Sequence, residues 1–203
     1  MIFDLSHGDL VQTFGAEHVH QVPEAAAQAA GFSGEALAFL TTVGLPENEF
    51  VSFPKFTDAG ARFRPVVSDE AATEWDLPST ASEWIVLGNF EISAIVMAPQ
   101  SGEVYELAEG IMRPVLLHKH LSSLVHTITA LTKIVQGLPE DYDHDDEYME
   151  QLEETLDSIK DEVGSQDPNP FSGEHNEWAE IITNIGAGMS GNSNSPTSPP
   201  KPG

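Results

Sequence analysis

The sequence of 203 residues contains no cysteine, few basic residues and no long apolar run. The absence of cysteine excludes disulfides, thiolate catalysis and cysteine-ligated zinc. The apolar stretches are all interrupted well short of the ~18 residues that a membrane-spanning helix needs. Residues 1–8 also lack the basic and apolar regions of a secretion signal. We therefore expect a cytoplasmic protein that does not bind or cross a membrane.

Only 8 residues are basic, against 33 acidic ones, and the net charge is −25. Nucleic acids and anionic membranes are bound through basic surfaces, so we expect neither as a partner. The negative field favours a basic protein or a cation. No phosphate-binding loop, nucleophile elbow or zinc-protease motif is present, so we expect no enzyme and no cofactor.

Residues 141–147 have the Asp-x-Asp-x-Asp spacing of a calcium-binding loop. Such a loop needs glycine at its sixth position and glutamate at its twelfth, where this chain has Asp146 and Leu152. The pattern therefore does not predict an EF-hand, although weak cation binding stays open. We interpret it as a solvated acidic loop that leads into a helix N-terminus, where acidic side chains are favourable.

Two histidine pairs, His18/His20 and His118/His120, have the spacing that would share one face of a strand and could bind zinc. The sequence places no third ligand beside either pair, so we expect surface or capping histidines and no metal site. We likewise interpret Ser122 and Ser123 as residues of a helix surface.

The hydrophobic pattern predicts an α+β fold. Short apolar runs at residues 84–88, 91–98 and 103–107 predict three strands of an antiparallel meander, with a turn at Gly102. An alanine-rich stretch that begins with a proline predicts a helix at residues 23–30. Apolar residues on one face predict helices at residues 35–43, 115–135 and 145–163, and a short helix around residues 178–185.

The acidic residues are concentrated near the C-terminus. Residues 140–203 contain 16 acidic and 2 basic residues, whereas residues 1–139 contain 17 and 6. The apolar residues of the 145–163 helix form a narrow seam, which predicts packing against one neighbour. We predict a domain at residues 1–139, an acidic helical extension at residues 140–185 and a disordered, Gly/Ser/Pro-rich tail at residues 186–203.

The carboxylates of residues 140–162 are dense enough to resemble the charge of a nucleic acid, or they serve solubility alone; both interpretations stay open. If they bind a partner, the candidate residues are Asp141, Asp143, Asp145, Asp146, Glu147, Glu150, Glu153, Glu154 and Asp157.

Several short motifs, in order and with suitable spacing, resemble those of a known family. The run Phe39-Leu40-Thr41-Thr42-Val43-Gly44-Leu45-Pro46 resembles the "FL..VGLP" entry of the SUKH-4 immunity proteins, a branch of the SUKH superfamily. Trp84-Ile85-Val86-Leu87-Gly88 resembles an apolar strand of that family, and Ser101-Gly102-Glu103-Val104-Tyr105 resembles its hairpin turn. The resemblance covers residues 19–135.

The resemblance implies a SUKH-like sheet, antiparallel or mixed, packed against helices. It also implies an immunity protein that binds and neutralises a cognate polymorphic toxin by occlusion, the toxin often being a nuclease or deaminase. The expected partner is then a basic toxin protein, and no catalytic residue carries over. The alternative is a regulatory or scaffold protein that uses the same fold. The sequence indicates no oligomeric state.

Overall fold

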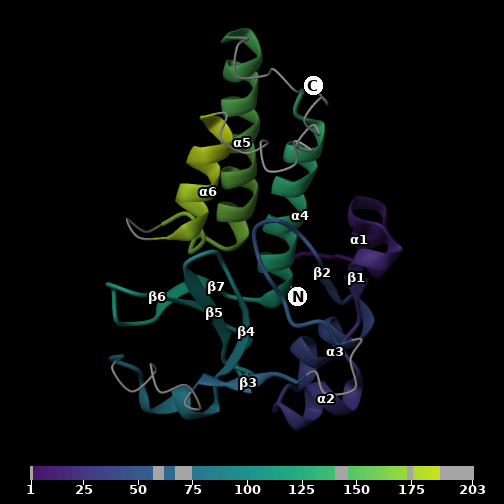
Figure 1. The fold of residues 1–203 in the computed structure, drawn as a ribbon, viewed down its shortest axis with the longest axis vertical. Helices are drawn as coiled ribbons and strands as arrows, with labels where there is room; N and C mark the ends of the chain where they lie inside the picture. The colour runs from purple at the N-terminus through teal and green to yellow at the C-terminus, as the bar shows by residue number, and fades with distance from the viewer. Residues whose placement is uncertain (1, 57–61, 67–74, 140–145, 173–175, 188–203) are drawn as a thin grey trace, which may run out of the picture.

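The computed structural model describes residues 2–56, 62–66, 75–139, 146–172 and 176–187 (Figure 1). This part of the chain forms six α-helices and two antiparallel sheets, which confirms the predicted α+β class. The predicted tail lies outside the described residues except for Gly186 and Ala187.

The larger sheet has five strands in the order in which they occur along the chain. They are β3 (Arg64–Pro65), β4 (Ile85–Asn89), β5 (Ser93–Met97), β6 (Val104–Ala108) and β7 (Val115–His118). The central three are the predicted meander. Alternation sends Leu87, Ile95 and Val104 to a face covered by helices, and Val86, Val96 and Leu107 to the opposite, outer face.

The prediction that a helix begins at residue 115 is wrong. Residues 115–118 form β7, which pairs with β6 through Val104↔His118 and Glu106↔Val115. Its apolar residues share the spacing of the helical stripe that follows, so periodicity does not separate the two elements. The helix α4 (Leu121–Gly137) begins after His120, whose backbone is still extended.

The N-terminal part of the chain builds a helical layer beside the sheet. It contains α1 (His7–Phe14), α2 (Glu24–Ala29), α3 (Gly34–Thr42) and a small sheet of β1 (Val19–His20) and β2 (Leu45–Pro46). Helix α1 was not predicted, although Ser6 and Asp9 form a capping box at its start.

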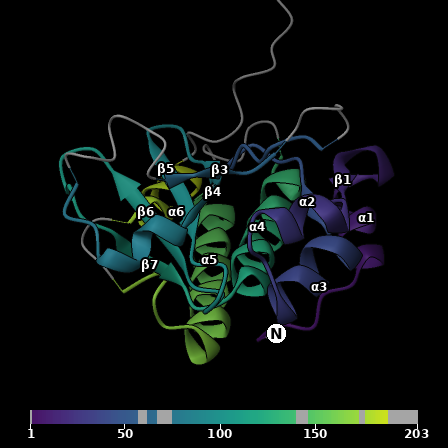
Figure 2. The same ribbon diagram turned by 90° about the horizontal axis from the view of Figure 1, so that it is seen from below.

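Helix α4 is the centre of the molecule, because it contacts α1, α3, β7 and α5 (Figure 2). Helices α5 (Asp146–Gln166) and α6 (Glu177–Gly186) lie on the other side of α4 from α1 (Figures 1 and 2). The prediction that the seam of α5 meets a single neighbour is wrong, since α5 packs against both α4 and α6. Leu152, Leu156 and Val163 are buried there.

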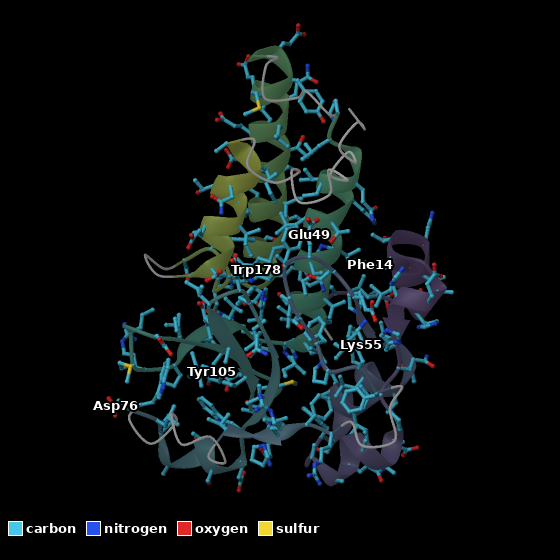
Figure 3. The ribbon with its side chains drawn as sticks, viewed as in Figure 1. Phe14, Glu49, Lys55, Asp76, Tyr105 and Trp178 are labelled. Atoms are coloured by element: carbon cyan, nitrogen blue, oxygen red, sulfur yellow. The ribbon has the colours of Figure 1, made fainter. Side chains whose placement is uncertain are left out.

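A buried polar cluster joins α6 to β7 and α4. The indole Nε1–H of Trp178 donates to Nε2 of His118 at 2.8 Å, and both side chains are fully buried. Because Nε2 accepts, the proton of the neutral ring is on Nδ1, which lies 3.0 Å from Ser123 Oγ. Burial lowers the pKa of His118, which favours this neutral form. Figure 3 shows Trp178 between the base of α6 and the sheet.

Asp167 ties the end of α5 to the same cluster. One carboxylate oxygen accepts from the Lys119 amide at 2.9 Å and the other accepts from Asn169 Nδ2 at 2.8 Å. Burial alone would raise the pKa of Asp167, but the hydrogen bonds from His118, the Lys119 amide and Ser123 outweigh it and lower the pKa. The position of α5 and α6 against the sheet therefore depends on polar contacts as well as on apolar packing.

We expect Trp178→Phe to lower the free energy of unfolding by about 2–4 kcal/mol. The change leaves His118 Nε2 buried without a donor, at a cost of about 1–3 kcal/mol, and the lost ring volume adds to this. Urea denaturation measures the difference. The control is Tyr105→Phe, which removes a hydroxyl that donates to Glu103 at the half-buried outer face and should cost no more than about 1 kcal/mol. Equal losses would contradict a special role for the Trp178 hydrogen bond.

The structure explains why the VGLP motif has glycine at position 44. Its φ is +94°, and a Cβ there would lie 2.7 Å from the carbonyl oxygen of His20 in β1. The small sheet thus leaves no room for a side chain at this position.

We expect Gly44→Ala to destabilise the protein more than Gly110→Ala does. Gly110 has a similar φ of +91° but open space around it, so the second change measures backbone strain alone, about 1–2 kcal/mol. The excess for Gly44→Ala reports the contact with His20. Thermal unfolding of the two variants makes the comparison, and equal melting temperatures would contradict it.

Candidate partner-binding surface

The structure places six of the nine predicted partner-binding residues on helix α5. Asp141, Asp143 and Asp145 lie outside the described residues, and Asp146 begins α5. The other side chains are exposed on α5, and they are Glu147, Glu150, Glu153, Glu154 and Asp157. A role for any of them in binding stays a prediction.

The acidic face of α5 follows from its sequence. Its apolar seam turns toward α4 and α6, so the remaining positions face outward. Lys160 is the single basic residue of the helix, and its Nζ lies 2.8 Å from Asp157. Two residues after Lys160, the carboxylate of Glu162 lies 3.1 Å from His126 Nε2 of α4. The exposed face therefore presents mainly carboxylates.

Two of the predicted residues border a groove between α5 and α6. Glu153 and Asp157 line this interhelical groove of about 380 Å³ together with Leu156, Ile182 and Thr183. Gly186 of α6 also lines the groove, and its Cβ position lies 3.7 Å from Leu156 Cδ1, which is an ordinary van der Waals contact. The groove combines apolar atoms at its base with charge at its rim, as protein interfaces do.

A second hollow, which sequence reasoning missed, lies between β6 and α6. This acidic cleft of about 510 Å³ is lined by Glu106 of β6, by Glu109 just after that strand, and by Glu177 and Glu180 of α6. Glu106 is buried, and burial raises its pKa even though the Glu177 amide donates to its carboxylate at 3.3 Å. The sequence contained one signal for this cleft. Glu106 lies two residues after Val104 in the predicted strand, so both side chains point to the same, inner face of the sheet.

Crowding of like charges is strongest at Glu177. Partial burial, together with the carboxylates of Glu106, Glu180 and Glu91, raises the pKa of Glu177 to about 7. The Trp178 amide donates a hydrogen bond to Asn176 Oδ1, which fixes the start of α6 and so holds Glu177 beside Glu106. A cation placed in this cleft would relieve the repulsion.

Three of the singled-out histidine and serine residues do not lie at the surface as predicted. His118 is neither a surface nor a capping residue, and Ser122 and Ser123 are buried instead of lying on the helix surface. The reason is that residues 115–118 form strand β7 and not a helix, so that His118 meets Trp178 of α6 and Ser123 lies beside the His118 ring. Ser122 Oγ accepts from the Ile2 amide at 3.1 Å and so holds the N-terminus.

The pair His18/His20 meets a carboxylate that the sequence did not place there. Glu47 lies 2.7 Å from His20 Nε2 and 3.3 Å from His18 Nδ1, but also 2.6 Å from Lys55 Nζ. Lys55, then the histidines, lower the pKa of Glu47 to about 2. Within the described ranges, no three His, Asp or Glu side chains have the arrangement of a metal site. The same part of the chain has no helix long and apolar enough to span a bilayer.

We expect Glu177→Gln to flatten the dependence of stability on pH. The folded-state pKa is raised from 4.5 to about 7, so the folded protein holds a proton that the unfolded chain releases between these values. Stability therefore falls as the pH rises through this window. The variant should match the wild type near pH 4 and exceed it near pH 8, by less than about 1 kcal/mol because solvent screens the group.

Urea denaturation at pH 4, 6 and 8 measures this. Glu24→Gln, which removes one exposed carboxylate from α2, controls for the loss of charge from the whole protein. A variant less stable than wild type at pH 8 would contradict the crowding of Glu177.

Comparison with known proteins assigns the chain to a family. The family model of the SUKH-4 immunity proteins matches residues 5–184. This match extends on both sides of the residues 19–135 that carry the resemblance, and it includes α5 and most of α6. Searches of curated proteins and of solved structures return no match. The resemblance is confirmed, and the chain belongs to the SUKH-4 immunity protein family.

Proposed function

We propose that this chain neutralises a toxin by binding a basic surface of it and blocking access to its active site. Membership of an immunity protein family supports the role. The single observation that carries the mode of binding is the exposed carboxylate face of α5, which is supported on both sides by α4 and α6. A rigid acidic face is suited to pair with a rigid basic one.

The charge density of α5 suggests which toxins fit. The helix has 21 residues and is therefore roughly 30 Å long. Its sequence contains eight carboxylates, which is about one for every 4 Å, compared with one per ~1.7 Å in duplex DNA. The distance per negative charge along α5 is therefore within a factor of about two to three of that along DNA, the substrate of many nucleases. A nuclease toxin, whose substrate-binding surface is basic, is our preferred partner.

Long-range attraction would act before contact. A net charge of −25 steers a basic partner toward the protein and raises the association rate above the ~10⁵–10⁶ M⁻¹s⁻¹ of uncharged pairs. Fast capture suits an inhibitor that must bind its toxin before the toxin meets its substrate. Occlusion needs no catalytic group on the inhibitor.

The test is binding to the toxin domain encoded by the neighbouring gene. We expect the wild-type chain to protect cells that co-express this domain and to form a complex with it at micromolar concentration or below. Continued killing of the cells, with no complex at micromolar concentration, would contradict the proposed function.

A charge-reversal variant tests the role of α5. Reversal of Glu150, Glu153, Glu154 and Asp157 to lysine should lower the association rate at low salt by about ten- to a hundredfold and reduce its dependence on ionic strength. Stopped-flow or surface-binding kinetics at 20–300 mM salt measure both quantities.

The matched control reverses four exposed acidic residues elsewhere and so changes the net charge equally. Suitable residues are Asp4, Glu17, Glu24 and Glu83. If both quadruple variants slow association equally, the net charge acts as a whole and α5 has no local role.

A further inference from the structure

The outer face of the sheet is only partly covered in the described structure. The 3-10 helix η4 (Ser79–Glu83) and Trp84 pack on one part of it, where Trp84 stacks on Tyr105 at 4.4 Å. Toward the other end of the strands, the apolar residues of this face border a hollow.

This apolar groove has a volume of about 340 Å³ and lies where β4 turns into β5. Val86, Val96 and Leu107 contribute from three neighbouring strands, with Ala94 beside them and Trp75 at one side. A volume of this size accepts one large aliphatic or aromatic side chain with its neighbours. The groove is therefore a pre-formed pocket on a rigid sheet.

Ile92 stands at the rim of the groove with 70% of its surface exposed. It is the one large apolar side chain of the described residues that is exposed to this degree. Single exposed apolar residues are common, but this one adjoins a concave apolar surface. The combination resembles the core of a protein interface.

The charges around the groove indicate what it would bind. Glu91 and Glu109 line it, and none of its described lining residues is basic. Glu109 also lines the acidic cleft, and Thr183 of that cleft lines the interhelical groove beside α5. The three hollows are therefore neighbours in series, from the acidic face of α5 to the apolar groove.

We infer that the apolar groove receives an aliphatic or aromatic side chain of the toxin, within a segment whose lysine or arginine residues face Glu91 and Glu109. This inference rests on the proposed function and adds a second contact to the acidic face of α5. A second copy of this chain is a poor occupant, because a protein of charge −25 repels itself.

The two contacts have different expected effects. Exposed carboxylates act mainly on association, whereas an apolar anchor in a pocket slows dissociation. The α5 face thus captures the toxin and the groove retains it. This separation allows each contact to be tested on its own kinetic constant.

Two groove variants test the inference against the purified toxin domain encoded by the neighbouring gene. Ile92→Asp places a charge at the rim, and Ala94→Trp fills the groove from its half-buried position. Each should weaken the complex by about ten- to a hundredfold, mainly through faster dissociation. Circular dichroism and melting temperature check that each variant is folded; since Ile92 is exposed, Ile92→Asp tests the groove even if Ala94→Trp unfolds.

A matched control is Ala25→Trp on α2, which adds the same side chain at an exposed position outside the groove. The charge contact is tested by reversal of Glu91 and Glu109 to lysine, against the same reversal of Glu17 and Glu24. We expect only the first reversal to weaken binding beyond the effect of net charge.

The possible outcomes separate the two proposals. Tight binding by the wild type and by both folded groove variants overturns the groove and leaves the proposed function standing. No binding by the wild type overturns both. A wild-type dimer in light scattering that Ile92→Asp abolishes, while toxin affinity is unchanged, also overturns the inference in favour of self-association.

Discussion

The hydrogen bond between Trp178 and His118 connects two parts of the chain that are 60 residues apart. It is buried on all sides, so its loss would leave a polar atom without a partner in an apolar surrounding. Ser123 and Asp167 complete the cluster and attach α4 and the end of α5 to it. Both hollows that border α6 depend on this arrangement, because it fixes the helix against β6 and β7.

The acidic surface lowers the stability of the protein when no partner is bound. Glu106 is buried, and partial burial together with the neighbouring carboxylates raises the pKa of Glu177 to about 7. Repulsion between these carboxylates lowers the stability of the free protein, and the basic partner that we propose would relieve it. A surface of this kind is consistent with a protein that works by binding, as expected of an immunity protein family.

Sequence patterns predicted the strands of the meander well, since runs of apolar residues between turns leave few alternatives. They failed at residues 115–118, where three apolar residues continue the spacing of α4 but pair with the edge of β6. They also missed α1, which is short and has its capping box as the clearest signal. The division at residue 139 stays a prediction, and α5 nevertheless packs against α4.

Part of the candidate site could also be predicted from the sequence, and part could not. The seam of α5 was sufficient to predict that Glu150, Glu153, Glu154 and Asp157 are exposed, because a helix with one apolar stripe must turn its other faces outward. The acidic cleft was not predictable, since Glu106 and Glu177 are 71 residues apart and meet only through the docking of α6. The sequence by itself determined the charge, the apolar patterns and the family motifs. Only the tertiary structure decided which carboxylates meet and where the described part of the sheet borders an apolar groove, because both depend on contacts between distant segments.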